Sequence, residues 1–129
     1  MKRLLLVFGF VSAAGCDPYL TAITPAPPLR VLELDAKNDR IELSEATAVA
    51  FECYRESQAC RDVHASVEPS DIAAVYSTHL AGLDRAWMRE RDTNVSTLTL
   101  VGLTPGTTRL RVTAEGWTHE YSVTVLAAR

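Results

Sequence analysis

The chain has 129 residues, of which 47% are apolar and 22% charged, values typical of one globular domain with a short appendage. Its formal net charge of -3 gives no electrostatic case for binding nucleic acid, which requires a basic surface. Beyond the N-terminal residues, no segment approaches the roughly 18 apolar residues that a membrane-spanning helix needs.

Residues 1–15 have the three-part pattern of a secretory signal peptide. Lys2 and Arg3 give a basic start, residues 4–11 form an apolar run, and residues 12–15 are small. The run is too short to cross about 30 Å of hydrocarbon, which disfavours a transmembrane helix. A buried N-terminal helix is the remaining alternative. The pattern predicts an exported protein.

The sequence SAAGC at residues 12–16 resembles the lipobox of bacterial lipoproteins, although Ala13 stands where that family favours leucine. In the family a diacylglycerol is attached to the cysteine, and a dedicated peptidase cuts before it. The resemblance implies cleavage between Gly15 and Cys16, a lipid on Cys16, and the membrane as a partner. It implies the bacterial cell envelope, with the domain in the periplasm or at the surface. Asp17 resembles the inner-membrane retention signal of enteric lipoproteins, but the choice of membrane stays open.

Residues 17–28, DPYLTAITPAPP, contain four prolines in twelve positions. This composition is typical of a semi-rigid extended linker. At about 3.1 Å per residue, such a tether could hold a domain about 35 Å from the lipid head groups. The predicted organisation is therefore a signal peptide over 1–15, a lipidated cysteine with a tether over 16–28, and one domain over 29–129.

After Pro28 the chain becomes a series of short runs in which apolar and polar residues alternate, separated by turn residues. Such runs predict β-strands. Segment 82–91 could be a strand or a turn of helix. Seven or so short strands over about 100 residues predict an all-β fold, an immunoglobulin-like antiparallel β-sandwich. The expected strand segments are 29–35, 40–43, 47–54, 62–68, 72–77, 96–102, 107–114 and 118–127.

The last two expected strands can be placed in register by the parity of their apolar residues. A two-residue connection at Glu115-Gly116 puts both apolar sets on one face, and Gly116 suits the positive φ of such a turn. The register places Arg111 opposite Glu120 on the outer face. The inward pairs are Ala114 with Trp117, Val112 with His119, and Leu110 with Tyr121.

Two stretches resemble bacterial immunoglobulin-like domains of the Big2 type. They are PSDIAAV at residues 69–75 and LVGLTPGTTRLRVTAEGWTHEYSVTV at residues 100–125. The family has a serine turn leading to an A-x-V strand, and then a G-L-x-P-G-T run into the penultimate strand. Segment 62–68 lacks the tryptophan that the family usually carries before its serine turn. The resemblance implies an immunoglobulin-like fold with a binding or structural role.

Cys53 and Cys60 are an even pair once Cys16 is set aside, and an exported domain meets an oxidising compartment. These facts predict a disulfide between them. A bridge across so short a loop contributes about 2.5 kcal/mol on the chain-entropy estimate. Two alternatives remain, free thiols and a metal site with His64, but no CxxC or HxxxH spacing supports a metal.

The most suggestive surface patch is RAWMRERD at residues 85–92, in which Arg85, Trp87, Arg89 and Arg91 share one strand parity. Tryptophan and arginine are enriched where proteins bind partners, which makes the patch a candidate interaction site. The alternative is an edge strand whose arginine stems cover a half-buried tryptophan and whose charges oppose aggregation.

No catalytic motif stands out in the sequence. The acidic stretch at residues 35–39 could bind calcium, but it lacks the EF-hand order of ligands and reads better as a plain turn. His64 is expected on the solvent face and His119 at the rim of the core, packed against Val112. We therefore expect neither a metal nor a cofactor, and no enzymatic activity.

These observations together predict a lipid-anchored envelope protein that presents an immunoglobulin-like module. Its role would be protein–protein contact, adhesion or envelope assembly, with a protein partner of unknown identity. The alternative is a carbohydrate-binding accessory module, or an enzyme subunit acting on envelope polymers. A carbohydrate module should display exposed aromatic side chains in a planar row. An enzyme should show a cleft where His64 and carboxylates converge.

Overall fold

The alternating segments form ten strands in the computed structural model, which describes residues 17–23, 25–56, 58–80 and 95–128. Within these ranges no helix is long and apolar enough to cross a membrane. The strands are β1 (Tyr19–Ala22), β2 (Leu32–Asp35), β3 (Arg40–Ser44), β4 (Ala48–Arg55), β5 (Gln58–Ala59), β6 (His64–Glu68), β7 (Ala73–Leu80), β8 (Val95–Gly102), β9 (Gly106–Ala114) and β10 (Trp117–Leu126).

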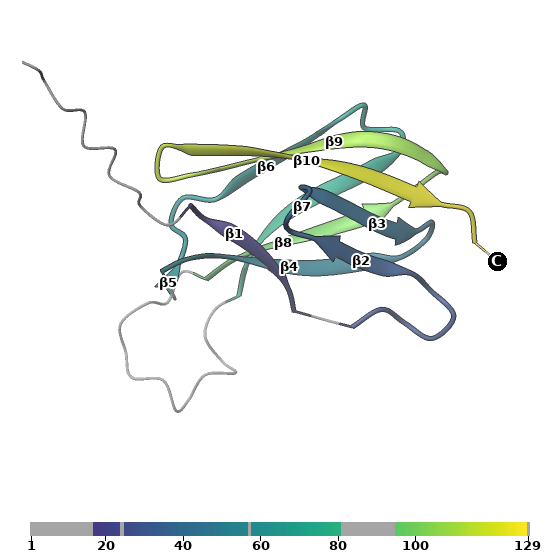
Figure 1. Ribbon diagram of the computed structural model, residues 1–129, viewed down its shortest axis with the longest axis horizontal. Coiled ribbons are helices and arrows are strands. Elements are labelled where there is room, and N and C mark those ends of the chain that lie inside the picture. The colour runs from purple at the N-terminus through teal and green to yellow at the C-terminus, as the bar shows by residue number, and fades with distance from the viewer. Residues whose placement is uncertain (1–16, 24, 57, 81–94, 129) are drawn as a thin grey trace, which may run out of the picture.

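The strands form two sheets that pack face to face (Figure 1). Sheet A has the order β1-β4-β8-β7, with β5 also paired to β4. Sheet B has the order β2-β3-β10-β9-β6. Every described pair of strands is antiparallel except β3 and β10, which run parallel. The fold is therefore an all-β sandwich, as the sequence predicts.

The core lies between the two sheets, because each strand turns its alternate apolar residues inward. Sheet A contributes Phe51 and Leu100, and sheet B contributes Ile41, Leu110 and Val123, all at most 1% exposed. Gly102 closes one end of this layer, where a Cβ atom would come within 2.8 Å of the Ser44 carbonyl oxygen. Glycine at this position therefore lets the end of β8 approach sheet B.

The tether expected over residues 17–28 is wrong for its first part, because Tyr19–Ala22 form β1 in sheet A. Leu20 lies opposite Cys53 in the register, and its side chain is only 3% exposed. The short apolar alternation of this strand gains burial against the core, and its proline neighbours do not prevent pairing because they lie outside it. The domain therefore begins well before residue 29.

The first strand expected after the tether is shorter than predicted. Segment 29–35 contains β2 only from Leu32, since Leu29 has a positive φ of 63° and is 95% exposed. The Arg30 amide donates to the Pro27 carbonyl oxygen in a turn, which directs the chain from β1 into β2. The remaining expected strands appear close to their predicted ranges, and segment 82–91 lies outside the described residues.

Candidate interaction site

The β9–β10 hairpin sets out charged side chains on the outer face of sheet B. Its two-residue connection has positive φ at both Glu115 (48°) and Gly116 (80°), as a tight hairpin turn requires. The pairs follow the predicted register, including Arg111 opposite Glu120 and Val112 opposite His119. Because successive residues of a strand alternate in direction, Arg111 and Glu120 both lie on the outer face.

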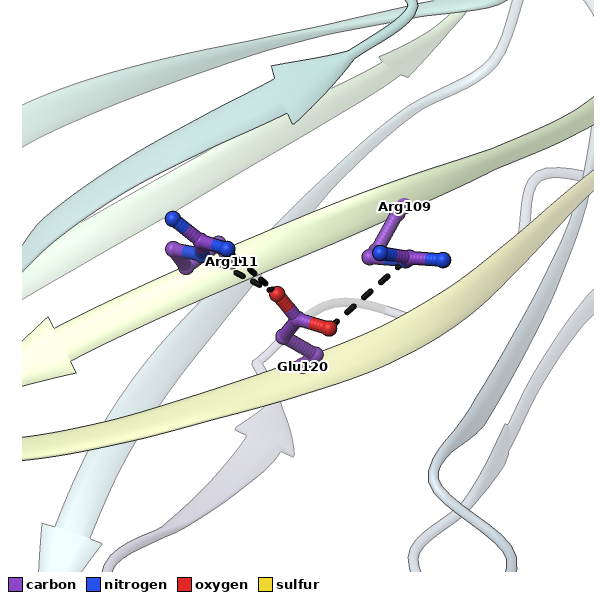
Figure 2. Close-up of polar contacts among 3 residues, drawn as sticks. All are labelled: Arg109, Arg111 and Glu120. Atoms are coloured by element: carbon purple, nitrogen blue, oxygen red, sulfur yellow. Dashed lines mark hydrogen bonds and ion pairs between the residues drawn. The ribbon is translucent and has the colours of Figure 1, made fainter.

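A three-residue ion cluster occupies this face (Figure 2). Arg111 donates two hydrogen bonds to Glu120 Oε1, from Nε at 3.0 Å and from Nη2 at 2.8 Å. Arg109 lies on the other side of the carboxylate, with its Nε 3.6 Å from Glu120 Oε2. Arg111 is therefore held by Glu120, whereas Arg109 makes only a loose ion pair with it.

The cluster is open to solvent, with the Arg109 side chain 68% exposed and that of Glu120 37% exposed. The hydrogen bonds from Arg111 hold the pKa of the Glu120 carboxyl below its ordinary value, and the charge of Arg109 adds to the effect. Glu120 therefore stays ionised at neutral pH, and the cluster carries two positive charges against one negative charge.

Two adjoining hollows surround the cluster on sheet B. The smaller has a volume of about 250 Å³ and is lined by Ser66, Glu68, Arg109, Arg111 and Glu120. The larger has a volume of about 590 Å³ and reaches from Glu68 and Pro69 past Arg109 and Glu120 to Asn38 and Asp39. Glu68, Arg109 and Glu120 line both, so the hollows form one polar surface across several strands.

The chemistry of this surface suits a polar macromolecule better than a small apolar ligand. Ligand pockets are usually lined by apolar and aromatic side chains with few polar groups, whereas charged and hydroxyl side chains dominate here. The described residues contain no group of three or more His, Cys, Asp or Glu side chains that could hold a metal ion. We refer to Ser66, Glu68, Arg109, Arg111 and Glu120 as the ionic face.

The sequence identified only part of the ionic face. Parity and turn chemistry within one hairpin predict the Arg111–Glu120 pair. The same parity would also have placed Arg109 beside it. The contributions of Ser66 and Glu68 depend on β6 lying next to β9, where Glu68 pairs with Arg109 in the register. Glu68 and Arg109 are 41 positions apart in the chain, and no local sequence pattern indicates which strands become neighbours over such a separation.

A second polar cluster lies on the inner face of the β9–β10 hairpin, at the rim of the core, and includes Asp39 from the turn before β3. His119 Nε2 is 2.7 Å from Asp39 Oδ1, and its ring stacks on Trp117 at a centroid distance of 5.2 Å. The Tyr121 ring meets the His119 ring edge-on at 4.9 Å. The sequence correctly predicts the rim position opposite Val112, but it does not predict Asp39, which is 80 residues away.

Tyr121 connects this rim to sheet A. Its side chain is buried, and its hydroxyl oxygen accepts a hydrogen bond from the Leu20 backbone amide in β1. Burial raises the pKa of Tyr121 to about 12, and the nearby Asp39 carboxylate adds to the rise. The hydroxyl therefore stays protonated at neutral pH and acts in packing and hydrogen bonding.

The predicted Cys53–Cys60 disulfide is present, and it joins the end of β4 to the residue after β5. Cys60 also donates its amide to the Cys53 carbonyl oxygen at 2.9 Å. His64 is exposed on β6, as expected. Cys16 and the patch of Arg85, Trp87, Arg89 and Arg91 lie outside the described residues, so their roles stay predictions.

The acidic stretch at residues 35–39 forms the turn between β2 and β3. Asp35 Oδ1 accepts hydrogen bonds from the amides of Lys37 and Asn38, at 3.1 and 3.2 Å. The Asn38 side-chain amide donates to Asp35 Oδ2, which lowers the pKa of the Asp35 carboxyl. These contacts hold the turn and engage both carboxylate oxygens of Asp35.

A scan against protein-family models and a search of curated proteins both find no match to this chain. Among solved structures, domains 1–6 of the surface layer protein SbsC are 16% identical with a TM-score of 0.51, over 78% of this chain and 14% of that one. Domains 4 and 5 of the S-layer protein SbsC are 14% identical with a TM-score of 0.46, over 76% and 54%. The chain thus spans about half, or less, of these structures. The likeness concerns the fold, a β-sandwich.

Proposed function

We propose that this chain is a cell-envelope module that is anchored by a lipid on Cys16 and binds a protein partner through the ionic face of sheet B. The proposed role is binding or structural, because the face combines a closed Arg111–Glu120 ion pair with a largely exposed Arg109. Arg111 and Glu120 neutralise each other, and Glu68 lies opposite Arg109 in the strand register. The partner's identity is left to experiment.

The observation that carries the binding role is the position of Arg109 in both hollows. Its guanidinium is mostly exposed, and its Nε is 3.6 Å from Glu120 rather than at close hydrogen-bond distance. Arginine is enriched among the residues that dominate protein interfaces, where its planar donors recognise carboxylates. An acidic side chain of a partner could therefore bind Arg109 while the Arg111–Glu120 pair fixes the surroundings.

The envelope location rests on the lipobox resemblance at residues 12–16 and is supported by the Cys53–Cys60 disulfide. Disulfides persist in exported proteins and are rare in the reducing cytosol. A surface layer protein contains domains of the same fold, which is compatible with this location. The Big2 resemblance remains part of the proposal as a description of the module.

A carbohydrate-binding module is less well supported. Trp117 stacks on His119 and packs partly buried against the core, so it offers little face to a sugar. Tyr19 and Tyr76 are 46% and 58% exposed, but they lie on β1 and β7, at opposite edges of sheet A. They therefore do not form a row with each other.

The anchor is tested by mass spectrometry of protein extracted from membranes. We expect an N-terminal acylated Cys16, and we expect Cys16→Ala to release the domain from the membrane fraction. A soluble wild-type product that begins at another residue would refute the anchor. Tight membrane association of the Cys16→Ala variant would instead indicate a spanning segment.

The binding role is tested by photo-crosslinking in intact cells. A photoreactive residue at Ser66 samples the ionic face, and one at Tyr76 samples the outer face of sheet A. We expect a discrete adduct from Ser66 alone, and its loss in the double variant Arg109→Glu, Arg111→Glu. Arg61→Glu, a charge reversal at the exposed residue that follows Cys60, is the control and should keep the adduct. Equal adducts from both positions would contradict the proposal.

A further inference from the structure

β1 begins only three residues after Cys16, so Asp17 and Pro18 alone separate the proposed lipid from the folded domain. A fully extended chain covers at most about 3.6 Å per residue, which limits the Cα–Cα distance from Cys16 to Tyr19 to about 11 Å. Because β1 is fixed in sheet A by its pairing with β4, the folded domain starts within this distance of Cys16. This excludes the spacing of about 35 Å between lipid and domain that a free tether would allow.

The register shows which end of the sandwich is close to Cys16. Tyr19 pairs with Tyr54 near the end of β4, where the hairpin to β5 turns back and pairs Arg55 with Gln58. In Figure 1 the start of β1, β5 and the β9–β10 turn lie together at the left end of the molecule. We call this the anchor end, defined by Tyr19, Tyr54, Arg55 and Gln58.

The far end is formed by the opposite termini of the same strands. There the Glu45 amide donates to the Leu126 carbonyl oxygen and the Ala46 amide to the Gly102 carbonyl oxygen. The C-terminus follows β10 at this end (Figure 1). Since β4 has eight residues at about 3.3 Å each, the two ends are separated by about 25 Å along the strands.

The anchor end has chemistry that suits a lipid surface. Tyr19 is 46% exposed, and its ring lies 6.2 Å from that of Tyr54 with an interplanar angle of 30°. Tyrosine is enriched at the level of lipid head groups, where its ring is apolar and its hydroxyl is hydrated. The exposed charges nearby do not attract anionic lipid, because Glu56 and Asp62 offset Arg55 and Arg61 while Asp17 and Glu115 add two negative charges. The short spacer therefore dominates.

We propose that the anchor end is a membrane-contacting surface, with Tyr19 and the β4–β5 hairpin at the lipid head groups and the far end directed away. This inference rests on the proposed lipidation of Cys16. The partner is the bilayer that holds the acyl chains. The ionic face of sheet B would then be roughly perpendicular to the membrane surface and accessible to a neighbouring envelope protein.

The test uses the acylated full chain, extracted from membranes and reconstituted into phosphatidylethanolamine–phosphatidylglycerol vesicles with nitroxide-labelled head groups. A fluorophore is attached to a single introduced cysteine under non-reducing conditions, either Gln58→Cys at the anchor end or Ala127→Cys at the far end. Both positions are exposed. We expect quenching at position 58 to exceed that at position 127 several-fold. Equal quenching, or stronger quenching at 127, overturns the inference.

A spacer variant tests the cause. Ten Gly and Ser residues inserted between Pro18 and Tyr19 add a mean span of about 18 Å and should lower the quenching at position 58 while the protein still sediments with vesicles. Unchanged quenching would show that the short spacer does not set the position. A protein whose Cys16 carries no lipid and that does not sediment with vesicles refutes the proposed anchor instead, so the two failures are distinguishable.

Discussion

The outer faces of the two sheets differ in chemistry although both are built from alternating strands of similar length. On sheet A, one cross-strand row consists of Ala50, Thr99 and Tyr76, which are uncharged. On sheet B, the corresponding kind of row runs through Glu68, Arg109, Ser122, Arg40 and Asp35. These rows therefore present hydroxyl, methyl and aromatic groups on sheet A and charges of both signs on sheet B, although the next row of sheet A contains Glu52.

This difference separates the groups that stabilise the fold from those that we propose for recognition. Exposed ion pairs contribute a median of about 0–1 kcal/mol, whereas a single buried aromatic side chain contributes several kcal/mol. The charges of sheet B therefore add little to the free energy of unfolding. Their arrangement around two hollows fits the proposed recognition of a partner, and the stability of both sheets comes from the shared core.

The largest expected effect is on that shared core. Phe51 lies on the inner face of β4 and is 0% exposed. Phe51→Ala should lower the free energy of unfolding by about 3–5 kcal/mol, because it removes buried contacts and leaves a cavity. Urea unfolding measures the change, and hydrogen exchange should show loss of protection in both sheets together. Protection lost in sheet A alone would contradict a common core.

The disulfide should have the next largest effect, and a more local one. Replacing Cys53 and Cys60 together by serine should lower the free energy of unfolding by about 2.5 kcal/mol, because the loop between them regains freedom in the unfolded chain. Denaturation with and without reductant gives the same comparison in the wild-type protein. Hydrogen exchange should increase most near β5 and least in sheet B. A uniform increase in both sheets would contradict a local stabilising effect of the disulfide.

The contrast between β1 and the β9–β10 hairpin explains what sequence reasoning could reach. The hairpin register follows from parity and from Gly116, both of which are local, and the structure agrees residue by residue. Strand β1 has four residues among prolines. It is stabilised by the burial of Leu20 against β4, a strand more than 30 positions away in the chain. Its local composition indicates a linker, and only the tertiary contact makes it a strand.

The contacts of the candidate site also fall into two groups, those between residues close in sequence and those between distant strands. The disulfide and the Arg111–Glu120 pair join residues within ten positions of each other, and both were predictable. The Asp39–His119 contact and the hollows lined by Glu68 depend on which strands become neighbours. Parity states which face a side chain occupies, but it does not state which strand lies beside it.

Tyr121 lies between the sheets, and its replacement should have an intermediate effect. Tyr121→Phe loses the hydrogen bond with Leu20, which should cost about 0.5–1.5 kcal/mol at pH 7. Burial and the Asp39 carboxylate raise the pKa of Tyr121 to about 12, above its ordinary value of 10. The neutral hydroxyl therefore stabilises the fold below pH 10, and this contribution is lost as the pH rises through 12.

Absorbance titration at 295 nm tests this assignment. The wild-type protein should show a tyrosine that ionises near pH 12, and this phase should be missing in Tyr121→Phe. Urea unfolding should show that the wild-type protein loses more stability than the variant between pH 10 and pH 12. An identical alkaline titration of both proteins would contradict the burial of this hydroxyl between the sheets.

The smallest expected effect on stability is at Glu120, where the comparison of the two faces is sharpest. Glu120→Gln should lower Tm only slightly, because the ion pairs are exposed and screened by salt. Arg111 holds the pKa of Glu120 below 4.5, so the carboxylate stabilises the fold above that pH and this contribution is lost as the pH falls through the lowered pKa. Wild type and variant should therefore converge in Tm at low pH, and also in 1 M salt at neutral pH.

The same substitution leaves Arg111 without its carboxylate. It should reduce the yield of the Ser66 crosslink strongly while it changes Tm only slightly. A large loss of Tm with an unchanged crosslink would reverse the comparison and make the ionic face a structural feature of sheet B.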